Sequence, residues 1–339
     1  MQSFNLPFQP IRGTLYSERE LFEGFDAADP SSFQRTRDFR IYRQFIKAGG
    51  ASSPDGFSTM MQSLHDNSIT QALRAFLSGQ RCVGIMGGHL VPRDADPYSR
   101  VARLARLFTR SSLMVATGGG PGVMEAAHRG ARLRSAPDAP LDAPLPQLRA
   151  EPSLPDLKSV VRRDGAVDGD LVEQAHRWVR PALEISLSAA DPGRSLAVPT
   201  WVYGHEPATP LATHFAKYFQ NSIREDGLLA MARAGVVFAE GTAGTIQEIF
   251  QDATQNVYKT FGSFSPMVFL GVDYWERRFP VRKILESLLD AAHFRRLLRF
   301  TDSIEQAHEF ILGFEPPAGA TGGVASLEGP ATPRRLDDP

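Results

Sequence analysis

Two glycine-rich turns, each followed by a helix with an early glutamate, are the parts of this sequence best suited to chemistry. The first turn runs through Gly118, Gly119, Gly120 and Gly122 to Met124 and Glu125. The second runs through Gly241, Thr242, Ala243, Gly244 and Thr245 to Glu248. A strand, a glycine turn and a helix together place free backbone N–H groups and the positive end of a helix against a phosphate. The sequence therefore predicts one anion site built from two loops of a parallel sheet.

The spacing in and around these turns argues against two common nucleotide sites. The first turn lacks the Gly-x-Gly-x-x-Gly spacing of a dinucleotide fingerprint, and a proline-rich stretch replaces the strand whose acidic end would bind a ribose. No Gly-Lys-Ser/Thr is present, which excludes a nucleoside triphosphatase loop. A third turn, Gly87 and Gly88, follows the predicted strand at residues 82–86 and joins the phosphate-binding candidates.

Two interpretations of the early glutamates stay open. Thr245 and Glu248 fit a capping box in which Thr245 is the N-cap, and Glu125 fits the same pattern less well. Alternatively, a carboxylate that the helix dipole keeps ionised could stabilise positive charge developing on a sugar, or activate a water molecule. Arg224, in the helical stretch before the second turn, is either a partner for phosphate or carboxylate or a member of a surface ion pair.

The composition is that of a globular protein without a charge excess. The 339 residues are 42% hydrophobic and 22% charged with a formal net charge of −1, so nothing points to nucleic acid or a membrane surface. Cys82 is the single cysteine and lies in an apolar stretch typical of a core. We find no apolar run of about 18 residues, no signal peptide and no metal-binding spacing such as His-x-x-x-His, and we expect a cytoplasmic protein without a metal.

Alternating strands and helices occupy most of the chain. Residues 1–80 are predicted to be an N-terminal helical extension, with a helix at 67–77 capped near Asp66 or Asn67. Residues 81–314 form the main domain, with a proline-rich insertion at 135–167, a strand at 195–203 and a helical stretch at 210–233. Residues 315–339 are predicted to be a disordered tail. This order predicts an α/β fold, a doubly wound parallel sheet of Rossmann-like type, whose ligands lie at the carboxyl ends of the strands.

At the two turns and between them, the chain resembles the Lonely Guy (LOG) family, labelled "lysine decarboxylase-like" in older usage. The family pattern is a Gly-Gly-Gly turn followed by Gly-Leu/Ile-Met, and later Pro-Gly-Gly-x-Gly-Thr-x-x-Glu. The first turn is similar to that of the longer bacterial members, and the second keeps Gly-Thr-x-x-Glu. Glu240 replaces the proline, Thr242 replaces the second glycine, and Arg224 resembles an arginine of the family at one residue greater spacing than the plant-type pattern. The resemblance covers residues 81–300.

The resemblance implies a Rossmann-like fold, dimers or higher oligomers, and phosphoribohydrolase activity without a cofactor. Such enzymes cleave the N-glycosidic bond of a nucleoside 5′-monophosphate, which is a cytokinin nucleotide or a common purine or pyrimidine nucleotide, to give the free base and ribose 5-phosphate. Glu248 would face the anomeric carbon, and Arg224 would bind the phosphate or orient Glu248. The alternative is a nucleotide-binding, sensing or carrier protein of the same fold without turnover, which the departures at Glu240 and Thr242 favour.

Overall fold

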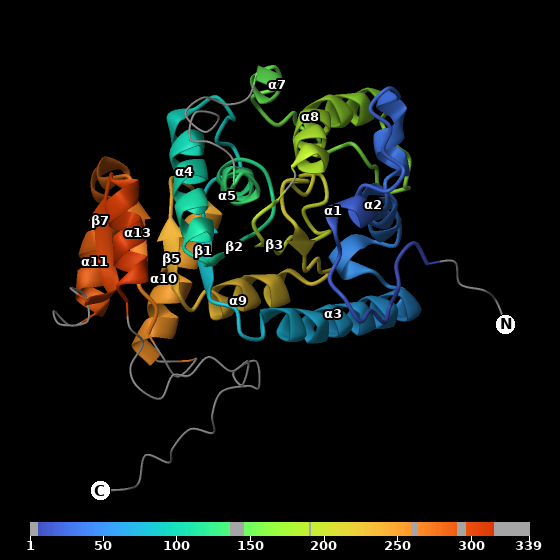
Figure 1. The fold of residues 1–339 in the computed structure, drawn as a ribbon. Helices are drawn as coiled ribbons and strands as arrows, with labels where there is room; N and C mark the ends of the chain where they lie inside the picture. Colours follow the sequence, from blue (N-terminus) through green and yellow to red (C-terminus); the bar gives the residue numbers. More distant parts are fainter. Residues whose placement is uncertain are drawn as a thin grey trace, which may run out of the picture.

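Helices cover both faces of a seven-stranded sheet in the computed structural model of this chain (Figure 1). The structure describes residues 6–135, 146–189, 191–258, 260, 264–289 and 296–314. The predicted tail and part of the predicted proline-rich insertion, residues 136–145, lie outside the described residues. None of the described helices is long and apolar enough to cross a membrane.

All neighbouring strands of the sheet run parallel, in the order β4-β3-β2-β1-β5-β6-β7. Their bounds are β1 (Cys82–Met86), β2 (Met114–Thr117), β3 (Ser195–Ala197), β4 (His214–Phe215), β5 (Gly235–Phe238), β6 (Met267–Leu270) and β7 (Leu298–Thr301). The chain builds the sheet outward from β1 to β4, then returns to place β5 beside β1. The strand order therefore reverses between β1 and β5, the position where sheets of this class bind ligands. The predicted doubly wound α/β fold is confirmed.

Side chains that alternate along the strands build two hydrophobic cores, one on each face of the sheet. In β1, Val83 and Ile85 face one core, whereas Cys82 and Met86 face the other. The helices that close the first core are α4 (Asp96–Arg110), α5 (Val123–Arg132) and α13 (Ile304–Leu312). Those that contribute to the second are α9 (Asn221–Met231), α10 (Ala243–Tyr258) and α11 (Val281–Leu288).

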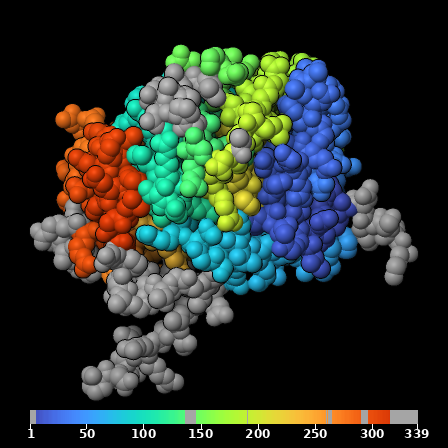
Figure 2. Space-filling model, viewed as in Figure 1, coloured from blue at the N-terminus to red at the C-terminus, as the bar shows by residue number. Residues whose placement is uncertain are grey.

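The N-terminal segment packs at the β4 edge and forms one end of the molecule (Figures 1 and 2). Its elements are α1 (Glu18–Leu21), η1 (Pro30–Arg35), α2 (Arg37–Lys47), η2 (Gly50–Ser52) and α3 (Gly56–Leu77). Phe39 and Leu73 are buried in the same core as Leu196 of β3, and backbone hydrogen bonds join Tyr16 to Phe215 of β4. The remaining described helices are α7 (Pro146–Arg149), α8 (Gly169–Ser188), which packs on η1, and the short η3 (Tyr274–Arg278) after β6.

The segment between β3 and α9 differs from its prediction. The predicted strand at 195–203 ends at Ala197, and the predicted helix at 210–233 begins only at Asn221. Residues 214–215 form β4 instead, because their backbone pairs with β3 and completes the edge of the sheet. The four-residue spacing of Phe215, Phe219 and Ile223 therefore wrongly predicted a helix before residue 221.

The start of α3 also differs from its prediction. The helix begins at Gly56, where the Asp55 side chain accepts a hydrogen bond from the Phe57 N–H. Asp66 and Asn67 consequently lie inside α3 and do not cap it. The Asp66 carboxylate is buried, and it caps a different part of the chain.

Candidate functional site

Three loops meet at the carboxyl edge of the sheet where the strand order reverses. The loop after β1 lies between the other two, because the Gly88 N–H donates to the Glu240 carbonyl at 2.8 Å and the Gly88 carbonyl accepts from the Val123 N–H at 3.1 Å. Glu240 begins the second glycine turn, and Val123 follows the first. The backbone of Gly88 therefore joins the two turns. At the preceding residue, Gly87, a Cβ would overlap the Val123 side chain, so this position has no room for a larger residue.

The first turn needs glycine for both conformation and space. Gly122 is the N-cap of α5 with a φ of 65°, and a Cβ at this position would overlap the Gly88 carbonyl. Because α5 begins immediately after it, the amides of Met124 and Glu125 have no carbonyl partner within the helix. The Met124 side chain lies against Gly120. The turn thus ends in the free amides of a helix N-terminus, which favours a bound anion.

Thr117, the last residue of β2, fixes the shape of this turn. Its hydroxyl oxygen accepts a hydrogen bond from the Gly119 N–H at 2.9 Å and lies 2.9 Å from His128 Nε2. Burial lowers the pKa of His128 to about 3, so the imidazole is neutral at physiological pH. His128 therefore has a structural role, which is to hold the Thr117 hydroxyl.

Arg224 connects the first turn with Glu248. Its guanidinium lies so close to Gly118 that a Cβ at that position would overlap Nη2. Nε donates to the Val198 carbonyl at 3.3 Å, and Nη1 is 3.7 Å from Glu248 Oε1. Arg224 comes from α9 and Glu248 from α10, the helices on either side of β5 in the sequence. The fold therefore places one cation and one carboxylate together beside the glycine turns.

Thr245 and Glu248 do not form the predicted capping box. The Ile246 N–H donates to the Thr242 carbonyl at 2.9 Å, and α10 begins at Ala243, so Thr242 occupies the N-cap position. Thr245 lies within the first turn of the helix, where its buried side chain packs beside Gly241. Glu248 is thus one helical turn too far along α10 for the carboxylate of a capping box.

The Glu248 carboxyl group titrates near neutral pH. Its side chain is only 14% exposed, and burial raises its pKa to about 7. Arg224 opposes that rise by favouring the charged form, and Glu225 adds to it. A partly buried carboxyl group beside an arginine, with a pKa in this range, has the properties of a group that exchanges protons or stabilises charge in a reaction.

The second turn presents its backbone to solvent. Thr242, Ala243 and Gly244 are exposed, and the amides of residues 243–245 have no carbonyl partner within α10 because the helix begins there. The Tyr274 hydroxyl donates to the Gly241 carbonyl at 2.6 Å and steadies the turn. Glu240 Oε1 lies 3.9 Å from the Cβ position of Gly271, at the end of β6. The charge of Glu240 is therefore directed toward the β6 loop, away from Gly88.

Glu125 belongs to an internal ion pair, and its assignment to phosphate binding is corrected. Its carboxylate is fully buried and accepts hydrogen bonds from Arg93 Nε at 2.7 Å, Arg93 Nη2 at 2.9 Å and the Tyr98 hydroxyl at 2.9 Å. Arg93 Nη1 also donates to the Trp178 carbonyl at 2.9 Å. A carboxylate enclosed in this way ties α5 to α4 and α8 and cannot reach a ligand at the turn.

Three polar side chains that the sequence analysis did not select lie near the first turn. Glu206 Oε2 is 3.8 Å from the Cβ position of Gly120. Glu206 Oε1 is 3.7 Å from His89 Nε2 and 3.9 Å from His205 Nε2. Their signal in the sequence was the pair His205-Glu206 close after a strand that ends at the ligand edge. Within the described part of the chain, no group of three His, Cys, Asp or Glu side chains could hold a metal ion.

Asp252, one turn beyond Glu248 on α10, is expected to make stability depend on pH. Its side chain is buried, Oδ2 has no hydrogen-bond partner, and burial raises its pKa to about 8 against the hydrogen bond from Ser265. The unfolded chain ionises this group near pH 4, so the fold loses stability as the pH rises from about 4 to 8. Asp252→Asn should therefore raise the melting temperature at pH 8 and have little effect at pH 4.5. A thermal shift that is equal at both pH values would contradict this account.

Comparison of the sequence with known proteins finds no relative, whereas comparison of the structure finds proteins of similar fold. No family model matches the chain, and no curated protein matches it. Among solved structures, the molybdenum cofactor binding protein of the phototrophic bacterium Rippkaea orientalis aligns over 69% of this chain and 96% of its own at 13% identity, with a TM-score of 0.39. The molybdenum cofactor carrier protein MCP of Chlamydomonas reinhardtii aligns over 69% and 99% at 15% identity, with a TM-score of 0.38. TM1055 aligns over 69% and 100% at 18% identity, with a TM-score of 0.42.

Proposed function

We propose that this chain hydrolyses the N-glycosidic bond of nucleoside 5′-monophosphates to the free base and ribose 5-phosphate, as its resemblance to the LOG family implies. The observation that carries the proposal is the meeting of Arg224 and Glu248 beside Gly118, where the strand order reverses. Neither helix that supplies these side chains needs them for its cap. A cation and a carboxylate of near-neutral pKa at a loop edge suit a charged sugar phosphate better than a structural ion pair.

The free amides around Gly88 suit the phosphate of such a substrate. The amides of residues 243–245 at the N-terminus of the sixteen-residue α10, and that of Met124 at the first turn, have no carbonyl partner within their helices. Helix N-termini bind phosphate through these amides and through the helix dipole. Arg224 adds a full positive charge that can also hold Glu248 in place. Glu206, close to Gly120, is suited to accept hydrogen bonds from the ribose hydroxyls.

In the proposed reaction, the bond between C1′ and the base nitrogen breaks and its electron pair leaves with the base. The positive charge that develops on the sugar is stabilised by the ionised Glu248 carboxylate. The oxygen of a water molecule then bonds to C1′, the water loses one proton, and the departing base takes up a proton. Glu248 is placed to position that water and to receive its proton, since its pKa lies close to neutrality.

The proposal is tested by incubating the purified protein with AMP, GMP, CMP, UMP and a cytokinin riboside 5′-monophosphate. We expect at least one of them to release its base together with an equal amount of ribose 5-phosphate. The matching nucleoside, which lacks the phosphate, should react with a much lower kcat/KM because binding at the turns no longer assists the reaction. Absence of base release from every nucleotide would reject the hydrolase.

The rate of hydrolysis is expected to fall as the pH drops below about 7. Glu248 acts in its charged form, and its pKa is raised to about 7, so kcat/KM should rise with pH through this value and level off above it. Glu225→Gln should move the rising limb to lower pH, because Glu225 raises the pKa of Glu248. A profile that is flat between pH 5.5 and 8, or that falls with rising pH, would remove Glu248 from this role.

A second candidate is a nucleotide-binding or carrier protein of the same fold without turnover. The observation that favours it is Thr242, which puts a side chain at the N-cap of α10 where the family pattern has glycine. The same incubation separates the two candidates. A nucleotide that raises the melting temperature of the protein, yet is recovered intact after prolonged incubation, would support the binding protein.

A further inference from the structure

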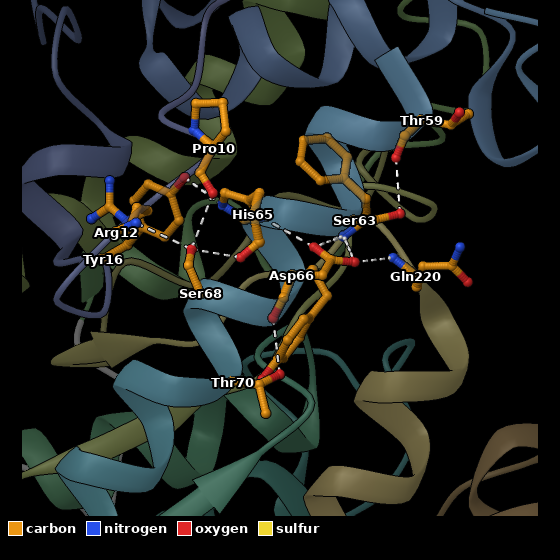
Figure 3. A network of polar contacts seen from close by, with 12 residues as sticks. Pro10, Arg12, Tyr16, Thr59, Ser63, His65, Asp66, Ser68, Thr70 and Gln220 are labelled. Atoms are coloured by element: carbon orange, nitrogen blue, oxygen red, sulfur yellow. Dashed lines mark hydrogen bonds and ion pairs between the residues drawn. The ribbon is translucent and has the colours of Figure 1, made fainter. Parts of the chain in front are cut away.

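The helix that carries Arg224 is capped by a carboxylate from the N-terminal segment. Gln220 occupies the N-cap position of α9 but makes no side-chain cap of its own. Asp66 of α3 supplies the cap: its carboxylate accepts from the Phe219 N–H at 3.0 and 3.1 Å and from the Gln220 N–H at 2.9 Å (Figure 3). The cap and the helix it serves are thus 154 residues apart in sequence.

Asp66 is held in turn by two further side chains. His65 Nδ1 lies 3.1 Å from Asp66 Oδ1, and His65 Nε2 lies 2.9 Å from the Tyr16 hydroxyl. Burial lowers the pKa of His65, so the neutral ring donates its Nδ1 proton to Asp66 and accepts from Tyr16. Tyr16 is fixed by backbone hydrogen bonds to Phe215 of β4. Figure 3 shows these three residues in one row, which ends at Gln220, the residue before α9.

This row cannot do chemistry on a ligand, although a tyrosine, a histidine and an aspartate in hydrogen-bond contact often do. Tyr16, His65 and Asp66 are 1%, 0% and 1% exposed. No substrate reaches groups so deeply buried. A carboxylate that accepts from two backbone N–H groups and one imidazole is instead a specific anchor for the helix end beside it.

Within the described part of the chain, the polar contacts that would fix Arg224 are long. Its hydrogen bond to the Val198 carbonyl is long, at 3.3 Å, and its separation of 3.7 Å from Glu248 exceeds hydrogen-bond distance. Arg224 is the fourth residue of α9, and it lies one helical turn after Gln220, the N-cap residue whose amide donates to Asp66. We infer that the place of the guanidinium beside Gly118 depends on where α9 begins.

We propose that Asp66 is a positioning residue for Arg224, and that the N-terminal segment is in this way a working part of the site. The inference rests on the proposed function for its effect on turnover, since it acts through Arg224. Its structural part, that Asp66 anchors residues 219–220 directly before α9, rests on the hydrogen bonds alone.

The test is a double-mutant cycle between Asp66→Asn and Arg224→Ala. We expect Asp66→Asn to lower kcat/KM about tenfold in the otherwise unchanged protein, because small displacements of a charged group in a site are costly. In the Arg224→Ala background the same substitution should change kcat/KM less than about twofold. An equal loss in both backgrounds would overturn the proposal, since Asp66 would then act on the whole fold.

Ser68→Ala is the matched control. Ser68 lies half a turn beyond Asp66 on α3, and its hydroxyl accepts from the Arg12 N–H at 3.1 Å, so it anchors the N-terminal chain and not α9. We expect kcat/KM to stay within about twofold for this variant. A tenfold loss in Ser68→Ala would mean that any disturbance of this network lowers activity, and would overturn a specific role for Asp66.

Hydrogen–deuterium exchange keeps the inference separate from the proposed function. The amides of Phe219 and Gln220, which donate to Asp66, and those of residues 224–226 in α9 should exchange faster in Asp66→Asn than in the unchanged protein, and at the same rate in Ser68→Ala. If Asp66→Asn does not fold, Tyr16→Phe, which removes only the hydroxyl that orients His65, should give the same pattern with a smaller change. Unchanged exchange at these amides overturns the proposal. A protein without turnover but with faster exchange leaves the anchor in place and rejects only the hydrolase.

Discussion

Replacing Glu248 with glutamine is expected to lower kcat for base release about 10³-fold, the scale at which a general acid–base group contributes. Glutamine keeps the size and the hydrogen-bonding reach of the side chain but carries no negative charge and accepts no proton. The nucleotide should bind with an affinity within about threefold of the original, since the amides of residues 243–245 and Arg224 remain. Initial rates and equilibrium binding of AMP, measured on the same protein, check both parts.

Gln247→Ala is the control for Glu248→Gln. Gln247 is the preceding residue on α10, and its side chain is exposed. Its removal should leave kcat within about twofold, as expected if a substitution in this turn of α10 does not by itself lower activity. Full turnover in Glu248→Gln would show that its carboxylate plays no part in the reaction, and loss of nucleotide binding in that variant would assign it to substrate binding instead.

Arg224→Ala is expected to lower kcat/KM about 100-fold. The guanidinium lies over Gly118 and 3.7 Å from Glu248, so its loss removes a cation from the site and leaves a mostly buried carboxyl group without its partner. Truncating one member of such a charged pair costs about 2–5 kcal/mol. Because Arg224 lowers the pKa of Glu248, the rising limb of the pH profile should also move to higher pH in this variant.

Arg224→Lys distinguishes charge from shape. Lysine restores the positive charge but lacks the planar fork that can contact a phosphate and a carboxylate at once. We expect it to restore the position of the pH profile and only part of kcat/KM. If Arg224→Ala leaves both kcat/KM and the pH profile unchanged, the phosphate is bound without this arginine. Arg224 would then have no role in the site.

The sheet and the two glycine turns could be predicted because their signals are local. Apolar runs such as residues 82–86 and 236–239 show buried strands without any knowledge of the rest of the chain. The carboxyl ends of parallel strands then lie along one edge, which indicates where a ligand binds. Residues 214–215 gave no such signal, since a two-residue edge strand is defined only by its pairing with β3.

The roles of single polar side chains were harder to predict, because each depends on partners that are distant in sequence. Glu125 and Glu248 follow similar turns, yet one is enclosed with Arg93 while the other lies beside Arg224. The prediction that Asp66 or Asn67 caps a helix at 67–77 was wrong, since α3 begins at Gly56, and the Asp66 carboxylate instead accepts from the amide of Gln220, directly before α9. Composition and periodicity cannot separate these cases, since only the fold brings the partners together.

A crystal structure of Glu248→Gln with AMP tests the central claim most directly, because a slow variant keeps its substrate intact. The account predicts the phosphate on the amides of residues 243–245, with C1′ beside the side chain at position 248 and within reach of Arg224. A nucleotide bound elsewhere, with both glycine turns empty, or a side chain at position 248 turned away from the sugar, would contradict it.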